Sequence, residues 1–223
     1  MKKLIMFGAG NYAMSVFYWL EHDAGHDIAA VTVDEKYVRS DEFCGVPMVS
    51  FSAVLSLYPP DQYDMFLPIS FQRLNRLREE RYLQAKANGY SIISYVSSRA
   101  STWDNVRIGE NCLIGPLCSV EPFATIGNNV TIGPNVVIGH HAVIEDNCFI
   151  APGSVVLGGV TVGKYSLIGA NATLKERISV GESSLIGAGA TILNDTKPKS
   201  VYLGATPRLL DQSSEQLGEW LIW

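Results

Sequence analysis

The sequence predicts an α/β half-domain of the Rossmann type followed by a parallel β-helix of about five coils. Two observations predict this fold class. Within the first 97 residues, short apolar strands alternate with glycine turns and helices. From Ile108 to Ile192, an aliphatic residue then returns at every sixth position, fifteen times in succession. A period of six fits neither an α-helix nor plain strand alternation, so it indicates a repeat architecture.

The composition is that of an ordinary globular protein. The chain has 223 residues, of which 47% are hydrophobic and 17% charged, and its net charge is −5. Because lysines and arginines form no cluster, nucleic acid and anionic membranes are poor candidates for partners. No segment has the length of a membrane span, and the N-terminal apolar run is too short for a signal peptide. We therefore expect a cytoplasmic protein without membrane insertion.

The N-terminal segment has the pattern of a phosphate-binding turn. Residues 2–7 form an apolar strand that runs into Gly8 and Gly10, and an apolar helix follows over residues 13–20. In this arrangement, backbone N–H groups and the helix N-terminus favour an anion. A second strand over residues 28–33 ends at Asp34, near the place where such folds contact a ribose. A tight turn without a ligand, a dinucleotide site and a nucleotide-sugar site all fit this pattern.

The rest of the first unit continues the alternation. We expect a strand over residues 63–69, a helix over 73–87 and a fourth strand over 90–96. Asn88 and Gly89 end the helix, whose charges of both signs suggest a solvated face. Alternating strands and helices imply a parallel sheet covered on both faces. The unit, assigned to residues 1–97, is half of a full dinucleotide domain, which favours a mononucleotide-sized ligand.

The repeat determines the shape of the second unit, assigned to residues 98–208. Three hexads make one triangular coil of about eighteen residues, with the aliphatic side chains along the axis. Four residues after each aliphatic position lies a column of mostly small side chains. Cys112, Cys118 and Cys148 belong to this column and are expected to be packed free thiols. The tail, residues 209–223, reads as a short amphipathic helix.

Two adjacent histidines stand out within the repeat. His140 and His141 occupy the third and fourth positions of a hexad, at an outward corner. A step of eighteen residues places Gly158 and Gly159 beside them, and a further step reaches Arg177. Imidazole accepts protons near physiological pH, and glycines leave room and N–H groups for a polarised carbonyl, as acyl transfer requires. A surface histidine pair without function and a solvated Arg177 remain the alternatives.

These features together resemble the hexapeptide-repeat nucleotide-sugar acetyltransferases, of the bacillosamine N-acetyltransferase and sialic acid O-acetyltransferase type. The resemblance rests on the glycine turn, the uninterrupted hexads and the stretches 139–144, 150–153, 158–163 and 204–208. It implies that the β-helix is left-handed and that the protein is a homotrimer with sites in the clefts between subunits. It also implies that residues 1–97 bind the nucleotide of a UDP- or dTDP-linked amino sugar through Gly8, Gly10 and Asp34.

The resemblance further implies a reaction. Acetyl-CoA would lie along the β-helix, near Gly158, Gly159 and Arg177. His140 would act as the general base for a direct transfer of acetyl to the sugar amine, with the Gly158 amide binding the thioester carbonyl. The product would serve lipopolysaccharide or other bacterial surface-glycan biosynthesis.

The chain departs from the family pattern at three positions. His141 stands where the family usually has an acidic residue that orients the base. Phe149 replaces a histidine found in many members, which suggests a changed acceptor pocket. Asn11 follows the glycine turn where relatives often have glycine, which would adjust how the nucleotide sits.

Three other functions share the fold or the same residues. A sugar O-acetyltransferase would use the same residues. A non-catalytic nucleotide-sugar-binding trimer would explain His141 and Phe149. A zinc carbonic anhydrase shares the β-helix, but a catalytic zinc needs about three protein ligands. Residues 98–223 contain only two histidines, His140 and His141, so no metal is expected.

Overall fold

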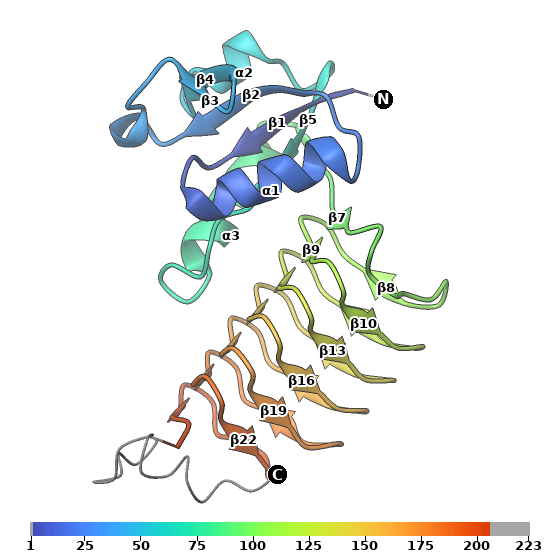
Figure 1. The fold of residues 1–223 in the computed structure, drawn as a ribbon. Coiled ribbons are helices and arrows are strands. Elements are labelled where there is room, and N and C mark those ends of the chain that lie inside the picture. Colours follow the sequence, from blue (N-terminus) through green and yellow to red (C-terminus); the bar gives the residue numbers. More distant parts are fainter. Residues whose placement is uncertain (1, 206–223) are drawn as a thin grey trace, which may run out of the picture.

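The computed structural model describes residues 2–205, and the predicted tail helix over residues 209–223 lies outside this range. An α/β domain covers one end and part of one side of a three-sided β-helix (Figure 1). None of the helices within the described range is long and apolar enough to cross a membrane.

The N-terminal domain is built on a six-stranded sheet in the order β3-β4-β2-β1-β5-β6, in which only β3 pairs antiparallel. Along β1, Leu4 and Met6 face α1, whereas Ile5 and Phe7 face α2 and α3. This alternation confirms the predicted parallel sheet with both faces covered. The elements are β1 (Lys3–Phe7), α1 (Asn11–His22), β2 (Ile28–Val33), the 3₁₀-helix η1 (Glu35–Tyr37), β3 (Glu42–Phe43), β4 (Val46–Ser50), α2 (Val54–Leu57), β5 (Tyr63–Phe66), α3 (Arg76–Ala87) and β6 (Ser91–Ile92).

The predicted fourth strand proved to be two strands in different domains. β6 closes the N-terminal sheet, whereas β7 (Tyr95–Val96) already pairs with the first full coil of the β-helix. Ser94 lies between them: its hydroxyl donates to Gly109 O at 2.7 Å and accepts from the Cys112 N–H at 2.9 Å. The side chain thus takes over backbone hydrogen bonds at the point where the chain leaves one sheet for the other.

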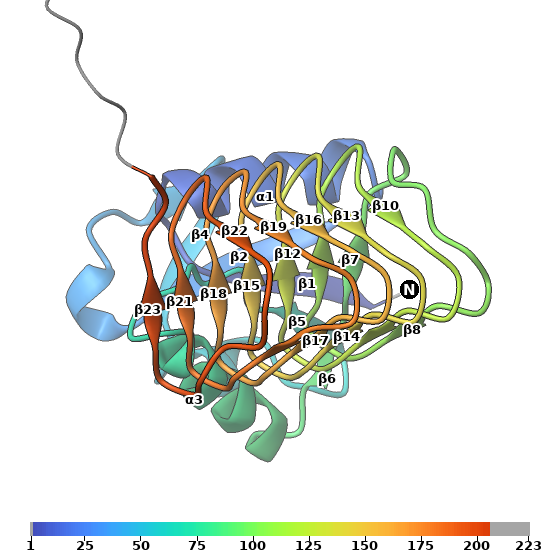
Figure 2. The same ribbon diagram turned by 90° about the horizontal axis from the view of Figure 1, so that it is seen from below.

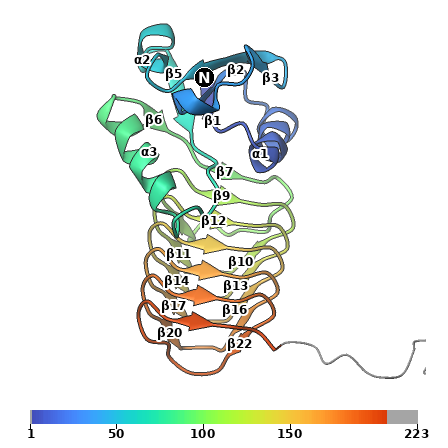
Figure 3. The same cartoon turned by 90° about the vertical axis from the view of Figure 1, so that its left-hand side faces the viewer.

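Residues 95–202 form three parallel sheets, one for each face of a prism (Figures 1 and 3). Neighbouring strands within a face are eighteen residues apart, as in Ile138 opposite Val156. This spacing confirms the predicted coil. The first face holds β10 (Ser119–Val120), β13 (Val137–Ile138), β16 (Val155–Val156), β19 (Thr173–Leu174) and β22 (Thr191–Ile192); the second holds β8 (Arg107–Ile108), β11 (Thr125–Ile126), β14 (Val143–Ile144), β17 (Thr161–Val162) and β20 (Ser179–Val180).

The third face is the longest and lies under the N-terminal domain. It holds β7, β9 (Leu113–Ile114), β12 (Thr131–Ile132), β15 (Phe149–Ile150), β18 (Leu167–Ile168), β21 (Leu185–Ile186) and β23 (Val201–Tyr202). Figure 2 shows α1 and α3 along opposite edges of this row of strands. The two helices therefore straddle the third face.

The corners of the prism explain a second regularity of the sequence. The fourth residue of nearly every hexad has a positive φ, for example 58° at Asn129, Asn135 and His141. Asparagine adopts this left-handed conformation more readily than most residues, so it recurs at the corners. Inside, the aliphatic and small columns form one buried core. Cys112, Cys118 and Cys148 are buried in it, and burial raises the pKa of the Cys148 thiol to about 12.

The expectation that helix 73–87 presents only a solvated charged face was wrong. Arg78 of α3 is fully buried between the domains. Its guanidinium donates to the carbonyl oxygens of Ile69, Asn129 and Cys148 at 2.9–3.1 Å and to Asn129 Oδ1 at 3.1 Å. Burial lowers the pKa of Arg78 to about 10, so the group stays charged near neutral pH. The helix begins only at Arg76, after three residues with positive φ, residues 73–75.

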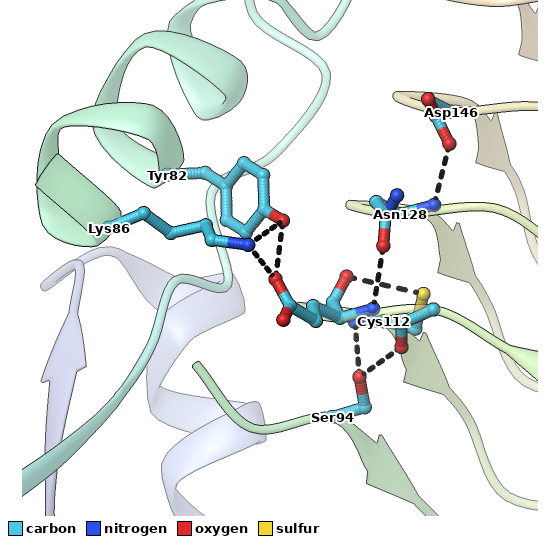
Figure 4. A network of polar contacts seen from close by, with 8 residues as sticks. Tyr82, Lys86, Ser94, Cys112, Asn128 and Asp146 are labelled. Carbon is cyan, nitrogen blue, oxygen red and sulfur yellow. Dashed lines mark hydrogen bonds and ion pairs between the residues drawn. The ribbon is translucent and has the colours of Figure 1, made fainter. Parts of the chain in front are cut away.

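Further polar contacts tie α3 to the same edge of the prism. Tyr82 Oη donates to a carboxylate oxygen of Glu110 at 2.7 Å, and Lys86 pairs with the same carboxylate (Figure 4). The Glu110 N–H then donates to Asn128 Oδ1, and the Asn128 N–H donates to Asp146 Oδ1. These hydrogen bonds link three successive coils at one corner, and α3 joins them at Glu110.

A second junction joins α1 to the first coil. The Asp23 carboxylate, just after α1, accepts hydrogen bonds from Tyr95 Oη at 2.6 Å, Ser97 Oγ at 3.0 Å and the Ser98 N–H at 2.9 Å, and also from Ser98 Oγ. Hydrogen bonds from Ser98 and Tyr95 hold the pKa of this carboxyl well below its usual range.

Replacing Asp23 by asparagine should lower the midpoint of thermal unfolding at pH 7 by about 3–6 °C, because charge-assisted hydrogen bonds are lost. Because the pKa of Asp23 is lower in the folded state, its ionised carboxylate stabilises the fold above the ordinary aspartate pKa of about 4. This stabilisation is lost progressively as the pH falls below that value. The difference between the wild type and Asp23→Asn should therefore shrink below about pH 4. Thermal melts from pH 7 to pH 3 at one protein concentration check this, and a difference that grows in acid would contradict it.

Candidate active site

The candidate site is the corner between the first and second faces, formed by Phe123, His140, His141, Gly158, Gly159 and Arg177 and called here the histidine corner. β13 leads into the histidines and β14 leads away. The Gly159 N–H donates to His140 O at 2.8 Å, and the Arg177 N–H donates to Gly158 O at 3.0 Å. These bonds bring the histidines, glycines and arginine into contact across successive coils, in the eighteen-residue register that the sequence predicts.

The imidazole of His140 lies over Gly158. A methyl group built on Gly158 would stand 2.6 Å from His140 Nε2 and 2.7 Å from Cε1, well inside van der Waals contact. Only a residue without a side chain leaves room for the ring here. Both histidines are exposed, so a substrate can approach Nε2 from solvent.

The two glycine amides differ. The Gly159 N–H is used by the carbonyl of His140. The Gly158 N–H donates to no acceptor among residues 2–205. The corner therefore offers one backbone N–H without an acceptor among residues 2–205, on the glycine under the His140 ring, where the sequence suggested a pair of glycine N–H groups. A single donor next to a base is still the arrangement that stabilises a developing oxyanion.

The carboxylates near the corner contact backbone groups and not the rings. Glu121 accepts the backbone N–H of His140 at 2.8 Å, and Glu145 accepts that of Lys164 at 3.1 Å. Asp146 accepts the Asn128 N–H. Sequence reasoning missed Glu121, although the sequence holds a signal for it. Glu121 precedes His140 by nineteen positions, and Glu145 precedes Lys164 by the same spacing.

A cavity of about 370 Å³ opens at the carboxyl ends of β1 and β2. It is lined by Gly8, Gly10 and Asp34, as expected, and also by Tyr37 and Arg39, which sequence reasoning missed. Gly8 has a φ of 128°, which favours glycine. Asn11 begins α1 next to the cavity but does not line it. The space suits a mononucleotide-sized ligand better than a dinucleotide.

Asp34 has an ionic partner within the domain. Arg81 Nε and Nη2 bind its two carboxylate oxygens at 2.7 and 3.1 Å. The hydrogen bond that Arg81 donates to Asp34 raises the pKa of Arg81. The pair fixes the carboxylate at the rim of the cavity, with lone pairs left for a ligand donor.

A second, mostly apolar cavity of about 420 Å³ lies between α1 and the third face of the prism. Phe149 lines it and meets Phe71 edge to face, with ring centroids 5.2 Å apart. Tyr12 lines both cavities. The two spaces are therefore neighbours, and Phe149 makes the second one apolar.

The histidine corner and the cavities lie on different sides of the chain. The corner joins the first and second faces of the prism (Figures 2 and 3). The second cavity lies beside the third face, and the first is lined by the N-terminal domain. One chain thus unites His140, His141, Gly158, Gly159 and Arg177, and separately unites Gly8, Gly10 and Asp34, with Phe149 in the adjoining cavity. It does not bring the two groups together. Within the described part of the chain, no group of three or more histidine, cysteine or acidic residues could hold a metal ion.

Family models match the repeat. The model described as bacterial transferase hexapeptide (six repeats) matches residues 105–140 and 141–176, and that described as hexapeptide repeat of succinyl-transferase matches residues 159–194. No curated protein sequence is similar enough to count as a relative.

Several solved structures share the fold over nearly their whole length. A variant of perosamine N-acetyltransferase from Caulobacter crescentus, in complex with CoA and GDP-perosamine, is 23% identical, with 92% of this chain and 94% of that chain covered and a TM-score of 0.83. The acetyltransferase domain of PglB from Neisseria gonorrhoeae, in complex with acetyl coenzyme A, is 22% identical, with 91% of this chain and 96% of that chain covered and a TM-score of 0.81. WeeI from Acinetobacter baumannii is 20% identical, with 94% of this chain and 100% of that chain covered and a TM-score of 0.83.

The repeat matches and the shared fold agree with the resemblance seen in the sequence. Residues 105–194 are hexapeptide repeats, of which 105–176 match the bacterial transferase model, and the chain has the fold of the sugar N-acetyltransferases, an α/β half-domain followed by a left-handed parallel β-helix.

Proposed function

We propose that the protein is an acetyltransferase that moves the acetyl group of acetyl-CoA to the amine of a nucleotide-linked amino sugar. The observation that carries the proposal is the imidazole of His140 lying over Gly158, whose N–H has no acceptor among residues 2–205. The nucleotide-sized cavity at Gly8, Gly10 and Asp34 supports it. So do the similar solved structures, which hold CoA with GDP-perosamine or acetyl coenzyme A.

The chemistry is a direct transfer. The sugar amine attacks the thioester carbonyl while His140 Nε2 accepts a proton from the amine. The Gly158 N–H donates to the carbonyl oxygen as it becomes an oxyanion, and CoA leaves as the thiolate. An acyl-cysteine intermediate has no support, because Cys112, Cys118 and Cys148 are buried and burial raises the pKa of each thiol. The exposed Cys44 belongs to the turn between β3 and β4 of the N-terminal domain and not to the histidine corner. Arg177, which is exposed on the coil next to the glycines, would bind an anionic group of CoA.

The acceptor sugar would occupy the apolar cavity beside the nucleotide. Phe149 and Phe71 give this cavity aromatic walls, which suit the less polar face of a sugar. Tyr12 separates the sugar space from the nucleotide space and lines both.

The protein should act as a homotrimer in which each site is shared. In one chain, the cavities face away from the histidine corner, so the sugar bound by one subunit needs the histidine corner of a neighbour. A closed ring of three subunits supplies such a neighbour for every cavity. Sedimentation of a monomer at micromolar concentration would contradict this arrangement.

Mixed trimers test the shared site directly. His140→Ala removes the base, whereas Gly10→Glu places a carboxylate in the nucleotide cavity. Space is open at Gly10 for a side chain, so the second variant should fold. Two variants that are each inactive should recover about a quarter of the wild-type rate when their subunits are mixed at random. No recovery in mixed trimers would mean that each chain completes its own site.

The reaction itself is tested by following thiol release from acetyl-CoA with UDP-, dTDP- and GDP-linked amino sugars. Mass spectrometry of the product should show an acetyl group on nitrogen, and acceptors with a hydroxyl in place of the amine should be poor. Faster transfer to the hydroxyl would make the protein an O-acetyltransferase. Tight binding of a nucleotide sugar without turnover of any acceptor would favour a non-catalytic binding trimer.

A further inference from the structure

The rings of His140 and His141 are in polar contact. Their Nδ1 atoms lie 3.2 Å apart, and the rings are nearly perpendicular, with an interplanar angle of 84°. A hydrogen bond between two such atoms requires that one carries a proton and the other a lone pair. The contact therefore selects between two tautomeric arrangements.

The backbone and the neighbouring coil hold His141 in place. Its φ of 58° belongs to the corner turn, and its N–H donates to Pro122 O at 3.2 Å. The ring rests on Phe123 of the preceding coil, with centroids 4.8 Å apart. Glu121 meanwhile holds the backbone N–H of His140. Both rings thus have a defined place before any substrate binds.

We propose that His141 is a positioning residue that accepts a hydrogen bond from Nδ1–H of His140 and so leaves the lone pair of His140 on Nε2, over Gly158. The opposite direction would place the proton on Nε2, where it would block proton acceptance. When Nε2 takes the substrate proton, Nδ1–H still donates to His141, so the contact survives the reaction. The proposal rests on the proposed function, and it answers what replaces the acidic residue usual at this position.

The other charged groups near the pair do not take this role. Glu121 is bound to a backbone N–H, and so is Glu145. Glu176 and Arg177 lie on the coil beyond Gly158 and are exposed. His141 is thus a neutral partner, which stabilises an imidazolium less than a carboxylate does.

Three substitutions of His141 separate this role from a structural one. Phe123 and Asn129 occupy the equivalent corner position with φ values of 67° and 58°, so phenylalanine and asparagine both fit there. His141→Asn keeps an acceptor and should retain kcat within about threefold, whereas His141→Phe should lower kcat by at least about tenfold with KM unchanged. His141→Glu supplies a charge and should move the acidic limb of the pH–rate profile to higher pH. His22→Asn, on α1, is the control.

A readout independent of turnover distinguishes this proposal from the proposed function. Nitrogen-15 NMR of the imidazoles at pH 8 should show His140 protonated on Nδ1 in the wild type and in His141→Asn, and a mixture of tautomers in His141→Phe. If these tautomers were observed without any acetyl transfer, the proposed hydrogen bond between His140 and His141 would stand and the proposed acetyltransferase function would be refuted. Acetyl transfer by His141→Phe with the wild-type kcat and pH profile would overturn the pair.

Discussion

Replacing His140 by alanine should lower kcat/KM for acetyl transfer by about 10²–10⁴-fold, the contribution usual for a general base. The KM for acetyl-CoA should change little, because the ring is needed for the proton and not for holding CoA. Steady-state thiol release measures both quantities. The corner is exposed, so circular dichroism and the unfolding midpoint should stay close to the wild type.

Control variants make the result specific. His22→Ala removes an exposed histidine on α1 and should leave the rate unchanged. The assignment of the base would be wrong if His140→Ala kept the full rate while His141→Ala had none.

Gly158→Ala tests the position of the His140 ring by a change on the next coil. The backbone at Gly158 does not have a positive φ, so alanine is allowed, and the Gly158 N–H remains. The new methyl group would nevertheless collide with His140 Nε2 at 2.6 Å and push the ring away. A displaced base should cost about 10–10²-fold in kcat. An unchanged kcat would mean that the ring does not work from this position.

Replacing Arg78 by methionine should lower the free energy of unfolding by about 3 kcal/mol, the largest stability effect expected in the chain. The carbonyl oxygens of Ile69 and Asn129 have no other donor within residues 2–205 and would be left buried without a partner. Methionine fills much of the space, so the loss reports the hydrogen bonds more than a cavity.

Arg76→Met is the matched control, because Arg76 lies on the same helix but is exposed over the ring of Tyr165. It should change the free energy of unfolding by no more than about 0.5 kcal/mol. Urea unfolding at one fixed protein concentration allows the comparison, since subunit association in the proposed trimer would also contribute to the free energy of unfolding. Equal stabilities of the two variants would show that the buried guanidinium does not hold the domains together.

The features that depend on local spacing could be predicted from the sequence. The six-residue period gave the pairing of Ile138 with Val156 and the contact of His140 with Gly158, since both follow from counting along one regular path. The glycine turn and Asp34 likewise marked the nucleotide-sized cavity.

The contacts that were missed join elements whose separation has no period. Arg78 looks like any other charge on a mixed helix until α3 is set against the Asn129 corner, fifty-one positions away. The partner of Asp34, Arg81, is likewise forty-seven positions distant. The Gly159 N–H is occupied because the corner turn directs the carbonyl of His140 at it. That direction is set by the backbone geometry of the turn.

Arg78 also fixes the level of the N-terminal domain along the prism, which matters for the proposed trimer. Coils are stacked about 4.8 Å apart, so the N-terminal domain can sit at whole-coil levels along the prism. Arg78 holds it at the level of Asn129, two corners before the histidine pair along the chain, and of Cys148, which follows the next corner after the pair. In a threefold ring, every subunit's histidines lie at one common level. The buried guanidinium would thereby hold each cavity at the level of the imidazole of the neighbouring subunit. A shift of the domain by one coil would move the acceptor out of reach of the base.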